Sequence, residues 1–388
     1  MSRCRVFTYI TLLVLLQQPA CPAVEEFRAA WVATVWNIDW PSKPALSTAR
    51  QQQELRAIFD EAKDIGLNTI IFQVRPAGDT FYKSAYEPWS GFLTGAMGRA
   101  PKPFYDPLEF AIKEAHKRGL KLHAWINPFR AKSGSYSFTS NHIIRKRPEW
   151  VKRSGKKLWM EPGIPEARTY VLKVTRDLVK RYDIDGIHID DYFYPYPPSN
   201  LKPKRQIFDD SKSWNTYRKS GGKLSRNDWR RDNINQFVEN FYKTVKRAKP
   251  HVLVGISPFG IWRPGVPPSI KASLDAYEHL CADSRFWLQM GWCDYFSPQL
   301  YWSIHPPDQS FTTLLHWWND QNVKGVKLWP GIASDRVGPK RSPDEIIRQI
   351  KLTRAVLKHP GHIHWSFSPL KENRRGLSKK LKTSVYYR

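Results

Sequence analysis

The stretch Asp185-Gly-Ile-His-Ile-Asp-Asp-Tyr-Phe-Tyr-Pro-Tyr-Pro197 has the pattern of a short buried strand that opens into an aromatic loop. Its apolar run is interrupted by His188 and ends in two adjacent carboxylates, Asp190 and Asp191. A strand that ends in acids and leads into aromatic residues is typical of barrel enzymes that present carboxylates to a sugar. The same pattern also fits acids that only cap the next turn or helix.

Short apolar runs alternate with longer amphipathic segments along the whole chain. We expect strands at residues 28–34, 68–74, 121–127, 186–192, 252–258, 295–301, 326–332 and 362–367. We expect helices at residues 48–65, 106–119, 166–181, 228–249, 273–290, 312–319 and 342–357. This alternation predicts the α/β class with parallel strands. Eight strands, with no glycine-rich phosphate loop after the first, favour a closed (β/α)8 TIM-type barrel over a doubly wound sheet.

The first 23 residues have the pattern of a secretory signal peptide. Two arginines precede the apolar run 6–16, and cleavage is expected after Ala20 or Ala23. The apolar run is too short for a membrane span, so we expect no integral span once the signal is removed. The chain should therefore be exported to the periplasm or cell envelope, with lipoprotein anchoring at Cys21 as the less favoured alternative.

A chain of 388 residues is long enough for one large domain. We expect the barrel to occupy residues 27–370 and residues 371–388 to form a basic, partly ordered C-terminal tail. Two polar and basic stretches, residues 127–163 and 200–231, follow expected strands. They should form long loops on the C-terminal face of the barrel, where active sites lie.

The composition narrows the class of partner. The formal net charge is +27, and the chain contains 17 Trp and 17 Tyr. Such a charge favours a polyanion, while aromatic faces stack on sugars as well as on bases. Export argues against nucleic acid and for an envelope polysaccharide. Cys281 and Cys293 either pair or lie buried, and without a CxxC, HExxH or clustered His-Cys motif no metal site or other cofactor is expected.

If the barrel forms, residues at the strand ends make up one rim. Polar groups there would bond sugar hydroxyls, and aromatic rings would stack on sugar faces. For His123 and His188, a role as neutral residues of the core remains open. The expected substrate-binding residues are Asn37, Arg75, His123, Trp125, Asn127, His188, Tyr192, Ser257, Gln299, Tyr301 and Trp302.

Glycoside hydrolysis requires one carboxyl group to protonate the leaving oxygen and a second to stabilise or attack the developing positive centre. We expect Asp190 to act at the reacting centre and Asp191 to point to the opposite side of the pleat. The candidates for the proton donor are Asp191, Asp79 and Glu161, the last two on expected active-face loops. Asp79 also suits a plain turn, and Glu161 also suits a loop surface.

Several motifs resemble the bacterial glycosyl-hydrolase-like 10 family. Two of them are Phe72-Gln-Val-Arg-Pro-Ala-Gly-Asp79 and His123-Ala-Trp-Ile-Asn-Pro-Phe-Arg130. The stretch that contains Asp190 and Asp191 also matches. The resemblance covers nearly all of the chain after the signal, in order, and is weakest at the last strand and the tail. The stretch that contains Asp190 and Asp191 spans residues 185–194. The other matching motifs are residues 28–41, 87–90, 162–166, 228–231, 255–258 and 297–302.

This resemblance implies a (β/α)8 barrel, export to the envelope and glycoside hydrolase activity. The most similar type within the family acts at cell division on peptidoglycan glycan strands that lack stem peptides. It implies an N-acetylglucosaminidase or muramidase, with cell-division or envelope partners. Asp190 and Asp191 carry over as matched residues, but the position of the proton donor does not. The lactyl carboxylate of muramic acid would suit a basic surface.

Two alternatives stand beside this interpretation. The stretch from Asp185 to Tyr192 also resembles the fourth strand of chitinase-type barrels, in which the acetamido group of the substrate attacks and an Asp orients it. Here a tyrosine occupies the place of their catalytic glutamate. A different class is a barrel that binds glycan without cleaving it and acts as an envelope adaptor, in which case the acids would be paired to Arg or Lys.

Overall fold

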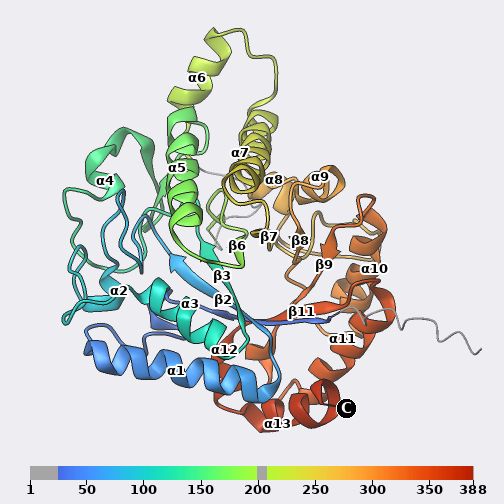
Figure 1. Ribbon diagram of the computed structural model, residues 1–388. Helices are drawn as coiled ribbons and strands as arrows, with labels where there is room; N and C mark the ends of the chain where they lie inside the picture. The colour runs from blue at the N-terminus through green and yellow to red at the C-terminus, as the bar shows by residue number, and fades with distance from the viewer. Residues whose placement is uncertain (1–24, 199–207, 388) are drawn as a thin grey trace, which may run out of the picture.

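The computed structural model describes residues 25–198 and 208–387, so the predicted signal segment 1–23 lies outside the described residues. Its centre is a parallel sheet in the order β10-β11-β1-β2-β3-β6-β7-β8-β9 (Figure 1). The strands are β1 (Phe27–Val32), β2 (Thr69–Arg75), β3 (Lys121–Ile126), β6 (Gly186–Ile189), β7 (Leu253–Ile256), β8 (Tyr295–Phe296), β9 (Lys327–Leu328), β10 (Gly331–Ile332) and β11 (Gly361–His364). Every expected strand is present, although most are shorter than predicted.

The two ends of this sheet belong to one segment of chain. β9 pairs with β8, β10 pairs with β11, and only Trp329 and Pro330 separate them. Pro330 has no N–H to donate, but its carbonyl accepts a hydrogen bond from the Ile363 N–H at 3.0 Å. The segment therefore changes partner at the proline and joins the edges of the sheet. The predicted (β/α)8 TIM-type class is confirmed.

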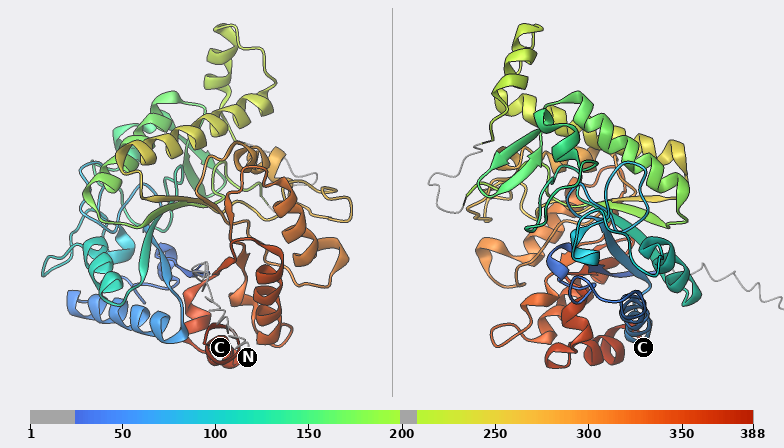
Figure 2. Two further views of the ribbon diagram at one scale, coloured as in Figure 1. Left: turned by 45° about the vertical axis from the view of Figure 1, so that its right-hand side comes forward. Right: turned by 90° about the vertical axis from the view of Figure 1, so that its left-hand side faces the viewer.

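Helices surround the strands on the outside, as both views of Figure 2 show. Local signals set their ends: Ser47 caps the first helix by accepting a hydrogen bond from the Arg50 N–H, and Gly66 ends it with φ 100°. No helix among residues 25–198 and 208–387 is long and apolar enough to cross a membrane. The principal helices are α1 (Thr48–Ile65), α3 (Pro107–Lys117), α5 (Pro165–Arg181), α7 (Arg226–Ala248), α9 (Ser284–Met290), α10 (Phe311–Gln321), α11 (Pro343–Val356) and α13 (Leu377–Leu381).

One expected helix is wrong. Residues 273–290 form two short helices, α8 (Ala276–His279) and α9, instead of one. Cys281 between them has φ 53°, which interrupts a right-handed helix, and the Asp283 side chain then caps α9. Cys281 and Cys293 are both buried free thiols and do not pair.

The two expected loops are more structured than the sequence indicated. Residues 127–163 contain α4 (Ile143–Lys146), the short helix η2 (Pro148–Trp150) and a hairpin of β4 (Val151–Ser154) and β5 (Lys157–Met160). The described part of 200–231 is also helical, because α6 (Ser211–Lys219) precedes the first turn of α7. Figure 1 shows α6 standing above α5 and α7, beyond the outline of the barrel.

Aromatic side chains fill the barrel. The Phe27 ring stacks on Trp329 with 3.8 Å between the ring centres. Tyr295 fits because Gly255 carries no side chain: a Cβ at Gly255 would lie 1.9 Å from the Tyr295 ring. The barrel interior is therefore a packed core that supports the mouth, and not a channel.

The expected tail is folded against the barrel in the structure. After α12 (Phe367–Lys371), α13 and the turns beyond it bury Leu377, Leu381, Val385 and Tyr386. The Tyr386 hydroxyl lies 2.6 Å from His362 Nε2 and 2.8 Å from His364 Nε2. These histidines face outward from β11, so the expectation of a partly ordered tail is wrong for the described residues up to 387.

Candidate active site

A small cavity lies at the carboxyl ends of the strands. Its volume is about 190 Å³, below the roughly 300–1,000 Å³ of pockets that enclose a drug-sized ligand. Such a cavity admits a group of the size of one sugar ring. Its lining comes from strands that are distant in sequence: Trp31, Trp125, Asp190, Asp191, Tyr192, Tyr196, Ser257, Gln299, Tyr301 and Trp365.

Asp190 is held at the end of β6 by donors from the neighbouring strand β3. Its Oδ2 accepts hydrogen bonds from Trp125 Nε1 at 3.0 Å and from the side-chain amide of Asn127. Its Oδ1 has a longer contact, 3.3 Å, with the Tyr192 N–H. The two shorter hydrogen bonds, from Trp125 and Asn127, therefore converge on one oxygen of the carboxyl group.

The orientation of the Asn127 amide is set two strands away. Gln73 Oε1 accepts the backbone N–H groups of Thr34 and Val35 at 3.0 and 2.9 Å. The Gln73 NH2 group must then donate, and it does so to Asn127 Oδ1 at 2.7 Å. This leaves the Asn127 NH2 group facing Asp190. A chain of hydrogen bonds that starts after β1 and passes through β2 and the end of β3 thus ensures that Asp190 accepts a hydrogen bond from the Asn127 NH2 group.

Asp191 lines the same cavity as Asp190, so the expectation that the two acids point to opposite sides is wrong. Strand β6 ends at Ile189, and the alternation of a pleated strand does not continue to Asp191. The Tyr196 hydroxyl donates a hydrogen bond to Asp191 Oδ2. The loop that follows the strand therefore folds back to supply a partner for the second acid.

The two acids are buried, at 4% exposure each, and they repel one another. Burial and then the charge of Asp191 raise the pKa of Asp190 to about 7, against the lowering effect of Arg130. Burial also raises the pKa of Asp191, against the lowering effect of Tyr196 and Gln299. Because each buried charge disfavours the ionisation of the other, the pair favours one neutral and one charged acid over two carboxylates, an arrangement that acid and base catalysis can use.

Three tryptophans form the wall around the acids. Trp365 makes edge contacts with Trp31 and Trp125, with 5.9 and 6.0 Å between the ring centres. Trp31, Trp365 and Tyr196 were not among the predicted site residues. Trp31 lies inside the expected strand 28–34 and Trp365 inside the expected strand 362–367, and only residues at strand ends were expected to form the site. The signal for Tyr196 was its place in the aromatic loop after Asp191.

Several predicted residues do line or support the cavity. Trp125, Tyr192, Ser257, Gln299 and Tyr301 line it with Asp190 and Asp191, and Asn127 contacts Asp190 from behind.

His188 lies beneath the floor of the cavity and has no solvent exposure. Its Nε2 is 2.8 Å from Ser257 Oγ, and its Nδ1 is 2.9 Å from the Tyr295 hydroxyl. It therefore supports a lining residue and does not line the cavity itself. His123 bonds the same Tyr295 hydroxyl at 2.9 Å but lies toward the opposite end of the barrel, beside Phe27.

The remaining predicted residues do not line the cavity. Arg75 is fully buried and forms a two-bond ion pair with Glu87 at 2.6 and 2.7 Å. The Asn37 amide donates to the Pro41 and Phe92 carbonyls. Trp302 packs on Phe259, with 5.6 Å between ring centres.

Two of the candidate proton donors also lie elsewhere. Asp79 is buried, its Oδ1 accepts the Ala77 N–H at 3.0 Å, and burial raises its pKa to about 6. Glu161 is buried 3.5 Å from Lys152 Nζ. Asp190 and Asp191 are therefore the two carboxylates that the described structure brings together at the mouth.

A parallel barrel with a buried pair of carboxylates and a tryptophan wall at its mouth defines a protein of the glycoside hydrolase type. The chain belongs to the glycosyl hydrolase-like 10 family, whose model matches residues 26–346. It is 42% identical to glycosyl hydrolase YngK of Bacillus subtilis over 93% of this chain and 72% of that protein. It is 34% identical to glycosyl hydrolase DigH of Escherichia coli over 87% of this chain and 82% of that protein.

Solved structures share the fold at low sequence identity. The glycoside hydrolase domain of PgaB from Bordetella bronchiseptica is similar with a TM-score of 0.61 and 12% identity, over 92% of this chain and 98% of that one. The catalytic domain of beta-amylase from Paenibacillus polymyxa has a TM-score of 0.61 and 11% identity, over 94% and 98%. Both structures match nearly the full length of the barrel described here.

Proposed function

We propose that this protein is an exported glycoside hydrolase that cleaves peptidoglycan glycan strands lacking stem peptides. The observation that carries the proposal is the pair of buried acids, Asp190 and Asp191, in a tryptophan-walled cavity of about 190 Å³. The family membership and the names of its relatives support hydrolysis of glycosidic bonds. The predicted signal segment 1–23 supports a periplasmic or envelope location.

The charge of the chain supports the substrate. A formal net charge of +27 favours an acidic polymer, and muramic acid presents a lactyl carboxylate once its peptide has been removed. Cell-division or envelope proteins remain the expected partners. Product analysis would decide between an N-acetylglucosaminidase and a muramidase, because the two leave different sugars at the new reducing end.

In the proposed mechanism, Asp190 donates the proton. This reverses the roles expected from the sequence, in which Asp190 acts at the reacting centre and Asp191 is a candidate donor. Asp190 Oδ2 already accepts hydrogen bonds from Trp125 and Asn127, so in the neutral form of Asp190 the proton belongs on Oδ1. This proton passes to the glycosidic oxygen as the bond to the anomeric carbon breaks. Asp191, as the carboxylate, faces the positive charge that develops there, either directly or through a water molecule that supplies the new hydroxyl group.

The alternative of a barrel that only binds glycan requires the acids to be neutralised by cations. Among the described residues, neither Asp190 nor Asp191 has a Lys or Arg nitrogen in a salt bridge within 4.0 Å. Arg130 is nearby, but its guanidinium lies 4.0 Å over the Tyr192 ring. This arrangement favours an enzyme over an adaptor.

The test is digestion of purified peptidoglycan, with and without prior amidase treatment, followed by mass spectrometry of the soluble products. We expect fragments from amidase-treated glycan only, and none with Asp190→Asn. An aryl glycoside whose leaving group is stable as an anion needs no proton, so Asp190→Asn should retain much of its activity on it while Asp191→Asn does not. If no glycan gives products, the proposed hydrolase activity is wrong. If both variants lose activity equally on both substrates, the assignment of Asp190 as the proton donor is wrong.

A further inference from the structure

A long groove lies on the outer rim of the barrel, apart from the cavity that holds the acids. It consists of two adjoining cavities of about 470 and 510 Å³, each more than twice the size of the acid cavity. Both are lined by Trp150, Pro165 and Glu166, so Trp150 stands between two lobes of one groove. Neither lobe shares a lining residue with the acid cavity.

The groove is on the same side of the barrel as the acids. Its lining includes the first turn of α5, which begins at Pro165, and the first turns of α7. In a (β/α)8 barrel each helix begins where the preceding strand has ended, at the carboxyl face. A polymer that enters the acid cavity can therefore extend toward this rim.

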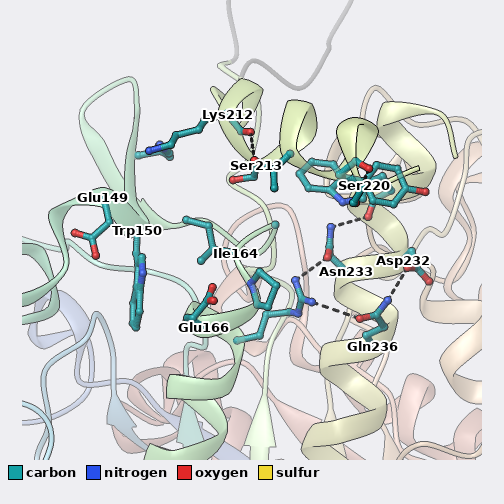
Figure 3. A pocket seen from close by; sticks show the side chains of 17 residues that line it. Glu149, Trp150, Ile164, Glu166, Lys212, Ser213, Ser220, Asp232, Asn233 and Gln236 are labelled. Carbon is teal, nitrogen blue, oxygen red and sulfur yellow. Dashed lines mark hydrogen bonds between the residues drawn. The ribbon is translucent and has the colours of Figure 1, made fainter. Parts of the chain in front are cut away.

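The first lobe combines aromatic faces with amide groups. Figure 3 shows Trp150 on one side of the lobe and Asn233 and Gln236 on the other. Trp229 and Tyr217 also line it, with 5.9 Å between their ring centres. Its charges balance in number, as the lining has three cations and three acids: Lys152, Arg168, Lys212, Glu149, Glu166 and Asp232.

Two of these cations, Lys152 and Arg168, are already committed to the protein. Lys152 Nζ lies 3.5 Å from the buried Glu161. Arg168 donates to the Pro162 carbonyl and to Asn233 Oδ1, both at 2.6 Å. It holds the amide of the wall in place. Flat apolar faces beside fixed polar groups match the faces and hydroxyls of a neutral sugar ring.

The second lobe is basic. Lys146, Arg147 and Lys173 line it against the single acid Glu166. The Arg147 guanidinium lies 5.4 Å over the Trp150 ring and 3.9 Å from Glu149 of the first lobe. Lys146 Nζ donates to the Tyr86 carbonyl at 3.2 Å, and Lys173 is exposed on α5. This excess of cations beside an aromatic ring suits a sugar that carries a carboxylate.

We propose that this groove is a second glycan-binding site, which holds a stretch of an amino-sugar polymer bearing carboxylates while another part of the strand occupies the acid cavity. The proposal rests on the proposed function, because it assigns the same polymer to both places. The neutral lobe takes one sugar face and the basic lobe takes a carboxylate-bearing neighbour. The groove thereby retains long strands in preference to short ones.

The test measures binding of amidase-treated glycan strands by isothermal titration calorimetry, in an Asp190→Asn background that prevents turnover. Reversing two charges, Arg147→Glu with Lys173→Glu, should weaken binding at least about 10-fold. Trp150→Ala should weaken binding as well. If Trp150→Ala does not fold, the charge-reversal variant alone still tests the groove. Arg176→Glu with Lys180→Glu is the matched control, since it also reverses one Arg and one Lys. Both residues are exposed on the same helix and line neither lobe, so this variant should bind as the parent does.

Hydrolysis separates this inference from the proposed function. With Asp190 intact, the charge variant should raise KM for long strands and leave kcat/KM for an aryl glycoside unchanged. Strand hydrolysis that depends on Asp190 but is unaffected by the groove variants would overturn the groove alone. Groove-dependent binding without hydrolysis of any glycan would overturn the enzyme and leave the groove. Binding of an envelope protein in the groove, with no effect of the variants on glycan, would overturn the inference.

Discussion

The side-chain amide of Asn127 donates a hydrogen bond to the carboxyl group of Asp190, from the end of β3 to the end of β6. The direction of this bond is not a free choice, because Gln73 donates to the other end of the Asn127 amide at 2.7 Å. Asn127 therefore acts on Asp190 only as a donor, and it lowers the pKa that burial has raised. A residue expected to bind substrate is thus better described as one that positions and tunes an acid.

Asn127→Ala should reduce kcat/KM by about 10- to 100-fold, since a hydrogen bond to a charged group contributes roughly 1.5–3 kcal/mol. The loss of a donor that lowers the pKa of Asp190 should also move the alkaline limb of the pH profile to higher pH. The profile of kcat/KM on glycan strands measures both effects. Asn240→Ala, on the exposed side of α7, is the control, and an unshifted alkaline limb in Asn127→Ala would show that the amide has no influence on the acid.

Asp190 should destabilise the folded protein above neutral pH. Its pKa is raised from 3.8 to about 7 in the folded state, so its contribution to folding is fully favourable at low pH and is lost as the pH rises between these values. At pH 8, urea denaturation should therefore give Asp190→Asn a free energy of unfolding roughly 1–3 kcal/mol higher than that of the parent. At pH 4 the two free energies should be about equal. The pKa values of Asp79 and Asp39 are also raised, so these acids make the parent protein depend on pH in the same direction. The effect of Asp190 is therefore the difference in unfolding free energy between variant and parent at each pH. Equal stability at pH 8 would count against a raised pKa.

The ion pair between Arg75 and Glu87 should be the most costly one to break. Both side chains have no exposure, and Arg75 also donates to the Asn127 and Pro128 carbonyls at the exit of β3. Arg75→Met leaves a buried carboxylate without its partner, for which we expect a loss of about 3–5 kcal/mol in the free energy of unfolding. Lys113→Met removes an exposed pair with Glu109 and should cost less than about 1 kcal/mol. Similar costs for both variants in urea denaturation would contradict the structure.

Gly255 should tolerate no side chain while Tyr295 is present. A Cβ at this position would lie 1.9 Å from the Tyr295 ring inside the barrel, so Gly255→Ala should cost about 3 kcal/mol or more. The penalty should shrink in a Tyr295→Ala background, which a double-mutant cycle measures. Gly338→Ala is the control, because the nearest atom to its Cβ would be 3.9 Å away. A penalty that is independent of Tyr295 would mean that the strand itself, and not the close approach, requires glycine.

Much of the fold could be predicted because its signals are local. The helix at residues 48–65 agrees with α1 at both ends, since Ser47 and Gly66 are capping residues recognisable in the sequence. The helix expected at 273–290 failed because only the folded chain shows the left-handed backbone at Cys281 that divides it. The site was predicted in part for a similar reason. Asp190 follows directly from the end of its strand, whereas Trp365 reaches the cavity only after the barrel has closed.

The sequence by itself determined the order of strands and helices, the parallel barrel and the presence of two acids at the end of the fourth strand position. Periodicity, caps and strand-end acids act over a few residues, so they are readable without a structure. Only the tertiary structure decided that Asp190 and Asp191 share one cavity, that Asp79 and Glu161 do not line it, and that Arg75 is paired to Glu87. Those outcomes depend on where β6 ends and on which distant strands meet at the mouth, and long-range packing determines both.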